Sequence, residues 1–171
     1  MKPYLGALAA LAILAAAWPA AAQQQGNPLV TQLEARKVVR GADGKESFAP
    51  ADNAKPGDVI EYVATYRNTG KQPLRNLEAT LPIPQSTEFV PGSANPGNAR
   101  ASVDAQTYAA MPLKRNTVKD GKPFEALVPV RDYRSLRWSA AELPAQKTAT
   151  FVARVKVIDD TGPPGAAKAG Q

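Results

Sequence analysis

The stretch KPGDVIEYVATYRNTG, residues 55–70, decides the fold expected for this chain. Its apolar and aromatic side chains recur at every second position, at Ile60, Tyr62, Ala64 and Tyr66. A period of two with β-branched and aromatic residues predicts a strand that buries one face. Pro56 and Gly57 precede this strand in the order that a type II turn requires, because Pro presets φ and Gly accepts a positive φ.

Segments on both sides of this stretch show the same alternation. After the turn at residues 68–70, Leu77, Ala79 and Leu81 alternate with polar residues until Pro82. This second strand is expected to form a hairpin with the first. A further hairpin is predicted around Asp43-Gly44, between residues 29–40 and 46–49. Other strands are expected at residues 87–90, 101–108, 135–138 and 150–157, the last of these being the longest clean alternation.

The fold class that follows is all-β. Because no window carries a helical period with caps at both ends, we expect about seven or eight strands in an antiparallel sandwich of immunoglobulin type. This single domain should span residues 23–158. Residues 91–100 and 112–129 are expected to be irregular, although an Asp120-Gly121 turn allows a short hairpin in the second. Residues 159–171, rich in Gly, Pro and Ala, are predicted to be a disordered tail.

The N-terminus has the pattern of a secretory signal. Lys2 precedes an apolar run from Leu5 to Ala17, and Ala20-Ala21-Ala22 supplies small residues before Gln23. We therefore predict a signal peptide at residues 1–22 and an exported protein, either periplasmic or secreted. A membrane anchor would need about 20 apolar residues, and no second apolar segment follows, so no transmembrane segment is expected after cleavage.

The composition removes most catalytic designs. The 171-residue chain has no Cys and no His, which excludes disulfides, thiolate or imidazole metal sites and a histidine base. No G-x-S-x-G motif and no calcium loop motif occur, although Asp43, Asp159 and Asp160 offer oxygen ligands. We predict no catalytic residues, no metal and no cofactor. A carboxylate-dependent hydrolase is an alternative, with Asp58, Glu61 and Asp132 as its candidate catalytic carboxylates. The competing interpretation is that these residues cap turns or lie on solvated strand faces.

The basic residues suggest a ligand surface. The chain carries 21 Lys and Arg against 15 Asp and Glu, a formal charge of +6. A candidate anion-binding set lies in the second irregular region and just after it: Lys114, Arg115, Lys119, Lys122, Arg131, Arg134 and Arg137. In an exported protein, anionic polysaccharide or glycolipid is a nearer ligand than nucleic acid, which is not expected as a partner. The competing interpretation leaves Arg137 solvated and packs Trp138 in the core with Leu136.

The ordered motifs resemble the bacterial conserved-repeat surface domain, a family known as domain of unknown function number eleven. The resemblance runs from Pro56 to Val157 and is carried by five segments, at residues 55–70, 81–84, 89–93, 136–138 and 150–155. It implies an immunoglobulin-like sandwich on exported proteins, often in tandem arrays, and no catalytic residues. This chain departs from the family in having one copy, a basic charge, and Leu143-Pro144-Ala145-Gln146 where a Pro-Gly turn is usual.

Together these features predict an exported, non-catalytic module of the cell envelope, structural or protein-binding, whose partner is an unknown envelope protein or an anionic polysaccharide. An exposed strand edge or the end loops would make the contact. The alternatives are a weak binder of anionic polysaccharide or glycolipid through the basic loop, and the hydrolase.

Overall fold

A computed structural model describes residues 28–159. The expected signal peptide, the first residues of the expected mature chain and the tail from residue 160 lie outside these residues. The described chain is all-β, with eleven strands and one short 3-10 turn, η1. The elements are β1 (Leu29–Arg40), β2 (Glu46–Pro50), β3 (Val59–Asn68), β4 (Leu74–Pro82), β5 (Thr87–Phe89), β6 (Arg100–Ser102), β7 (Ala109–Ala110), β8 (Lys114–Lys119), β9 (Lys122–Leu127), η1 (Val130–Asp132), β10 (Ser135–Leu143) and β11 (Thr148–Val157).

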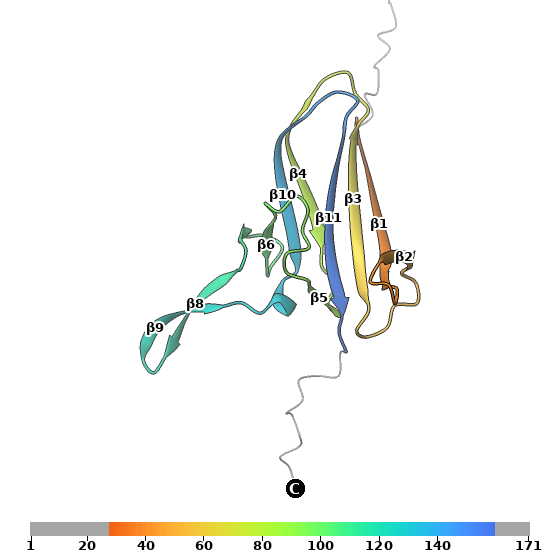
Figure 1. The fold of residues 1–171 in the computed structure, drawn as a ribbon. Helices are drawn as coiled ribbons and strands as arrows, with labels where there is room; N and C mark the ends of the chain where they lie inside the picture. Colours follow the sequence, from red (N-terminus) through yellow and green to blue (C-terminus); the bar gives the residue numbers. More distant parts are fainter. Residues whose placement is uncertain (1–27, 160–171) are drawn as a thin grey trace, which may run out of the picture.

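Two antiparallel sheets face each other, in the manner of a β-sandwich (Figure 1). One sheet has the strand order β2-β1-β3-β11-β5 and the other β4-β10-β6-β7. The alternating side chains predicted from the sequence fill the space between them, because each strand turns its apolar face inward. The core contains Ile60, Ala64, Tyr66, Leu77, Ala79, Leu81, Leu136, Trp138, Phe151, Ala153 and Val155.

Aromatic side chains occupy the centre of this core. The ring of Phe151 lies 5.4 Å from that of Trp138 in the opposite sheet and 5.7 Å from that of Tyr66, measured between centroids. Trp138 is 1% exposed, and Leu136 beside it on the same face is fully buried. The interpretation of Trp138 as a core residue is therefore confirmed.

The expected hairpin between residues 58–67 and 77–81 is wrong. The first segment is β3 and the second is β4, and the two strands lie in different sheets. The chain crosses from one sheet to the other between Asn68 and Leu74, and β3 pairs instead with β1 and β11. Alternation reports only that one face is buried, and it is the same for strands that pair and for strands that face each other across a core.

The number of strands and the extent of the strand expected at residues 101–108 also differ from the prediction. The expected strand at 101–108 ends at Ser102, because the carboxylate of Asp104 accepts hydrogen bonds from the Ser102 hydroxyl and from the backbone N–H groups of Gln106 and Thr107. These bonds close a turn in place of a strand. The sandwich strands exceed the expected seven or eight because short strands such as β7 have no alternating pattern to detect.

The irregular region at 112–129 contains a full hairpin, β8 with β9, which projects from the sandwich (Figure 1). We call residues 114–127 the arm. The first hairpin was predicted correctly, since β1 and β2 pair around the turn at Gly44. Among residues 28–159, no helix has the length and apolar character needed to cross a membrane.

Candidate functional site

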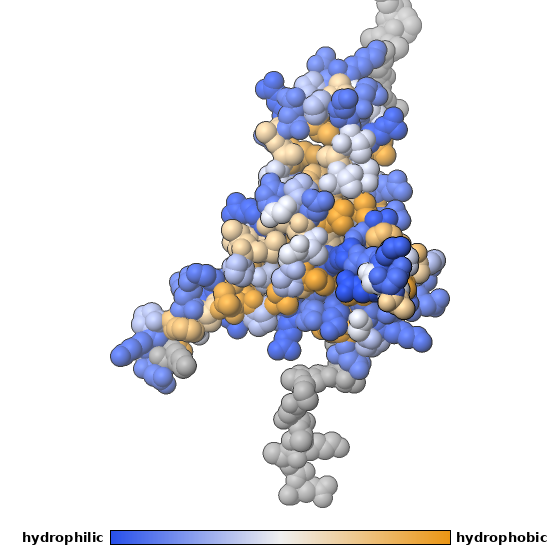
Figure 2. All heavy atoms as spheres, in the orientation of Figure 1, coloured by the Kyte–Doolittle hydropathy of each residue, from blue (hydrophilic) through white to orange (hydrophobic). Residues whose placement is uncertain are grey.

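Large apolar side chains are exposed in two main places on the described surface. Val30, Leu33, Val39 and Phe48 lie on β1 and β2, while Val118, Phe124 and Leu127 lie on the arm, with Val103 exposed as well. Hydrophobic atoms interrupt the hydrophilic surface of the arm in the space-filling view (Figure 2). Exposed apolar side chains that share one element contribute to interaction sites. The two places are therefore the candidate contact surfaces.

On one of its two sides, the first half of β1 has no neighbouring strand among the described residues. β3 pairs with β1 from Leu29 to Val38, but β2 pairs with it only from Arg36 to Arg40. Residues 29–35 therefore have a strand on one side and no strand of the described chain on the other. We call residues 29–35 the β1 edge segment.

The hydrogen bonds at the two ends of β1 show which backbone groups face the open side. Thr69 N–H donates to Pro28 O across 2.7 Å, so even-numbered positions bond toward β3. Gly41 N–H donates to Lys45 O across 2.9 Å, so odd-numbered positions bond toward the β2 side. In an antiparallel pair these directions alternate along the strand. Thr31, Leu33 and Ala35 therefore point their N–H and C=O groups out of the sheet.

The edge segment lacks the features that usually keep an edge from pairing. β4, the outer strand of the other sheet, carries Asn76 with φ at 53°, which interrupts its regular edge, and ends at Pro82. The edge segment has one charge, Glu34, and neither Pro nor a residue with positive φ. Val30 and Leu33 are about half exposed, at 52% and 51%. An edge strand without Pro, bulges or clustered charges is a template for an added strand.

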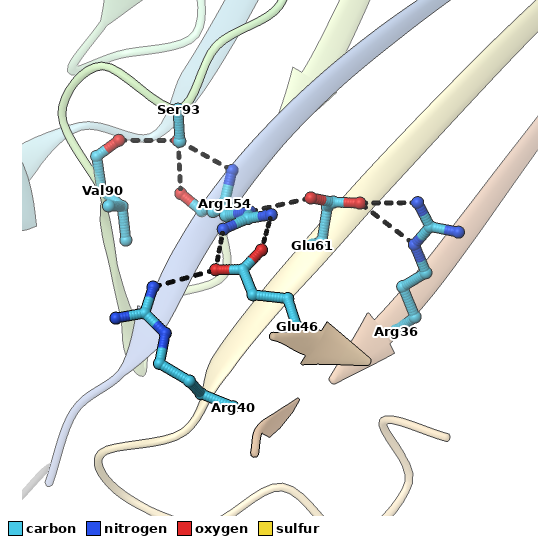
Figure 3. A network of polar contacts seen from close by, with 7 residues as sticks. All are labelled: Arg36, Arg40, Glu46, Glu61, Val90, Ser93 and Arg154. Atoms are coloured by element: carbon cyan, nitrogen blue, oxygen red, sulfur yellow. Dashed lines mark hydrogen bonds and ion pairs between the residues drawn. The ribbon is translucent and has the colours of Figure 1, made fainter. Parts of the chain in front are cut away.

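A network of charges holds the sheet together where the edge segment ends (Figure 3). Glu61 of β3, 5% exposed, lies between Arg36 of β1 at 2.7 Å and Arg154 of β11 at 2.8 Å. Arg154 also bonds to Glu46 of β2 at 2.8 Å. Burial acts to raise the pKa of Glu61, but the hydrogen bonds from Arg36 and Arg154 outweigh it and the pKa is lowered. The network therefore links β2 to β11 across the face of the sheet.

Two of the three carboxylates proposed for a hydrolase have structural partners. Asp58 accepts a hydrogen bond from Lys55 N–H at 2.8 Å and pairs with Lys37 at 3.4 Å. The Lys55 bond lowers the pKa of Asp58. Glu61 is held in the network, and Asp132 lies in η1. Asp58 therefore fits the competing interpretation as a turn cap, since it closes the turn before β3. Glu61 is buried in the network and is not on a solvated face.

The structure divides the seven predicted basic residues. Lys114, Arg115, Lys119 and Lys122 lie on the arm, where Lys114 pairs with Glu125 at 2.7 Å. Lys119 and Lys122 are opposite each other in the backbone register. Arg115 and Lys122 are exposed. A depression of about 410 Å³ at the root of the arm is lined by Lys114 and Arg115 but also by Asp104 and Asp132. Hydrogen bonds from Ser102, Thr107 and Gln106 lower the pKa of Asp104 to about 2, so the Asp104 carboxylate is anionic at neutral pH.

The three arginines predicted beside Trp138 lie outside the arm. Arg131 is in η1, and the guanidinium of Arg134 donates to the carbonyl oxygens of Arg131 and Tyr133. Arg137 lies over the ring of Tyr108 at 3.8 Å and pairs with Glu78 at 3.2 Å. The Arg137 side chain is 28% exposed, so it is partly solvated while the ring and the carboxylate engage it.

One of the candidate calcium ligands, Asp43, has a structural role in a turn. Asp43 accepts a hydrogen bond from Lys45 N–H at 3.1 Å and so closes the turn between β1 and β2. Asp160 lies outside the described residues. Between residues 28 and 159, no group of three or more acidic side chains is placed to hold a metal ion.

Comparisons with known proteins add no relative. No protein-family model matches the chain, no curated protein matches it, and no solved structure matches its fold.

The edge segment was not predicted from the sequence, although the sequence contains a signal for it. The strand expected at residues 29–40 is more than twice as long as the one expected at 46–49, so a hairpin between them must leave part of the longer strand unpaired. What lies beside that part depends on distant strands.

Proposed function

We propose that this protein is an exported, non-catalytic module of the bacterial cell envelope, built as an immunoglobulin-like sandwich, that binds a protein by strand addition along the β1 edge segment. The open backbone groups of Thr31, Leu33 and Ala35 carry the proposal. Strand addition obtains affinity from main-chain hydrogen bonds and specificity from alternate side chains. Half-exposed Val30 and Leu33 would supply apolar contact on the two faces.

Several observations support the rest of the proposal. Two antiparallel sheets with a Trp buried against the opposite sheet are usual for immunoglobulin-like sandwiches. The apolar run at residues 5–17 followed by small residues supports export. Partnered carboxylates at Asp58 and Glu61 support a non-catalytic role.

The binding proposal is tested by photo-crosslinking in cells. A photoreactive residue in place of Gln32 should give a crosslinked product of higher mass. The product should be lost when Leu33→Lys is added, because a charge facing inward at an edge disfavours pairing. Val118→Lys on the arm is the matched control and should leave the product unchanged. Equal products in both backgrounds, or none in either, would count against strand addition.

Export has a separate test. Cell fractionation should recover the protein outside the cytoplasm, and N-terminal sequencing should begin at Gln23. A cytoplasmic protein that retains Met1 would contradict export without bearing on the edge segment.

A second candidate function is binding of anionic glycolipid or polysaccharide through the arm. The observation that favours it is that exposed cations, Arg115 and Lys122, share a projecting hairpin with exposed Val118 and Phe124. Sedimentation with vesicles containing an anionic lipid should then fall with salt, since attraction between exposed charges is screened. Charge reversal at Lys114, Arg115, Lys119 and Lys122 should abolish it, and an unchanged affinity would exclude the arm.

A further inference from the structure

We propose that the arm binds the surface of an anionic lipid bilayer by placing Val118 and Phe124, which lie near its tip, among the lipid headgroups. Arg115 and Lys122 would contact anionic groups of the same headgroups. This proposal rests on the second candidate function, and it selects lipid over polysaccharide as the ligand. It is independent of the β1 edge segment.

The backbone register places Val118 and Phe124 on opposite faces of the arm. In an antiparallel pair, residues directly opposite each other share a face, and successive residues along a strand alternate between faces. Phe124 of β9 lies opposite Thr117 of β8, and Val118 lies opposite Pro123. Val118 is 69% exposed and Phe124 is 51% exposed. Both faces of the arm therefore present an apolar side chain to the surroundings.

Apolar exposure on both faces favours a bilayer as the ligand. The arm projects away from the sandwich (Figure 1), and neither Val118 nor Phe124 belongs to the hydrophobic core of the described residues. A flat protein surface, or a polysaccharide chain lying on an aromatic ring, would cover one face and leave the other in water. A hairpin tip that enters a bilayer is surrounded by lipid, so both side chains are transferred from water into an apolar environment.

The turn at the tip sets how far the arm can enter. Asp120 and Gly121 have φ of 53° and 74°, which is the conformation of a two-residue turn that keeps a hairpin narrow. Phe124 follows Gly121 by about 10 Å of strand, and surface-bound elements enter a bilayer by about 5–10 Å. β8 and β9 form a two-stranded sheet with no further strand of the described chain beside it, and such edges must stay hydrated. The tip is therefore expected to reach the headgroup region and no deeper.

The charges of the arm suit an anionic surface on the face that carries Phe124. Alternation puts Arg115 and Lys122 on that face, where both are exposed and neither forms an ion pair with a described residue. Glu125, the acidic residue of the two strands, lies on the other face and pairs there with Lys114 at 2.7 Å. Lys and Arg are attracted to an anionic membrane surface, and their long apolar stems let the charge stay at headgroup level.

Vesicle binding by the purified protein tests the insertion. Vesicles of equal parts phosphatidylglycerol and phosphatidylcholine should bind the protein, and vesicles of phosphatidylcholine alone should bind it more weakly. The double variant Val118→Ser, Phe124→Ser keeps every charge and should weaken binding to the anionic vesicles by at least about tenfold, because it removes two apolar side chains from the contact. The double variant Val30→Ser, Leu33→Ser, at residues 52% and 51% exposed on the β1 edge segment, is the matched control and should leave binding nearly unchanged.

Tryptophan fluorescence reports whether the tip enters the bilayer. Phe124→Trp puts an indole at the tip, and the parent protein, whose Trp138 is buried, gives the background signal. When anionic vesicles bind, the emission of this variant should shift to shorter wavelength and be quenched by lipids brominated on the acyl chains near the headgroup. A soluble polyuronate at the same concentration of charge should cause neither change.

Each outcome decides the proposal. Weaker vesicle binding by the tip double variant, together with the spectral shift, supports insertion. Binding that falls with salt but is unchanged in the tip double variant overturns insertion, and it leaves the second candidate function standing through charge alone. The same holds if the parent protein binds the polyuronate and no vesicle. Vesicle binding that survives both the tip double variant and charge reversal of the arm overturns insertion and the second candidate function together. Unchanged thermal unfolding of each variant shows that the fold is intact.

Discussion

Asn68 donates a hydrogen bond of 3.0 Å from its side-chain amide to the carbonyl oxygen of Leu143, and this bond joins the end of β3 in one sheet to the end of β10 in the other. Asn68 is completely buried. The same amide lies 2.8 Å from Gln72 O, and the Asn68 side-chain oxygen accepts from Gly70 N–H at 2.9 Å. One side chain therefore ties together the segment by which the chain changes sheets.

Replacing Asn68 with Ala should destabilise the fold by about 2–4 kcal/mol, because the buried Leu143 carbonyl and the partly buried Gly70 N–H would lose their partner. Urea denaturation followed by circular dichroism measures the change. Asn116→Ala on the exposed arm is the control and should cost about 0.5 kcal/mol or less. Similar losses for the two variants would show that the Asn68 bonds do not hold the crossing.

Glu61 should make stability depend on pH. Its folded pKa lies below the ordinary value of 4.5, so its contribution is complete above that value and is lost as pH falls through the folded pKa. Glu61→Gln should lower the unfolding free energy at pH 7 by about 3 kcal/mol, since it leaves two arginines without their buried anion. The difference from the parent protein should shrink toward pH 3.

The control for this series is Glu125→Gln, which removes an ion pair with Lys114 whose two side chains are both 54% exposed. Exposed pairs contribute little, so this variant should change stability by about 0.5 kcal/mol or less at either pH. A Glu61→Gln deficit of the same size at pH 7 and pH 3 would contradict the role assigned to the network.

Substitutions of Gln146 should show the free-energy cost of a non-glycine residue with a positive φ. It stands at φ 60° in the turn between β10 and β11, and its amide donates to Thr69 O and Gly70 O. Gln146→Ala and Gln146→Gly both lose these bonds, but Gly alone relieves the backbone. The Gly variant should therefore be more stable than the Ala variant by about 1 kcal/mol. An Ala variant of equal or greater stability would exclude this turn geometry.

Trp138, which lies in the core, should limit backbone opening of residues 91–98. Its indole N–H donates to Pro96 O at 2.7 Å. Trp138→Phe keeps an aromatic ring against Phe151 but loses that bond, so stability should fall by about 1–3 kcal/mol. Amide hydrogen exchange should rise at Asn95, whose N–H bonds to Val152 O, more than at residues of the arm. A uniform change over the whole protein would point to a loss of core packing alone.

The strands with a buried face were predictable in position. β3 and β11 begin and end within two residues of their alternating patterns, and the turn at Gly57 and the β1–β2 hairpin follow from local turn residues. The arm was not predicted at its full length, because neither of its faces is buried and its side chains therefore follow no period. The turn at Asp104 was not predicted, because a single carboxylate accepts its hydrogen bonds and leaves no repeating pattern in the sequence.

The sequence by itself determined that this chain is a β protein with a Trp-centred core, because burial of one strand face leaves a period of two in the local residue order. Tertiary structure alone decided that β3 and β4 oppose each other instead of pairing, that β2 pairs with β1 no further than Arg36, and that the basic residues divide between the arm and other elements. These are relations between residues far apart in the chain. Whether an edge is open depends on which distant strand lies beside it, and no local pattern records that.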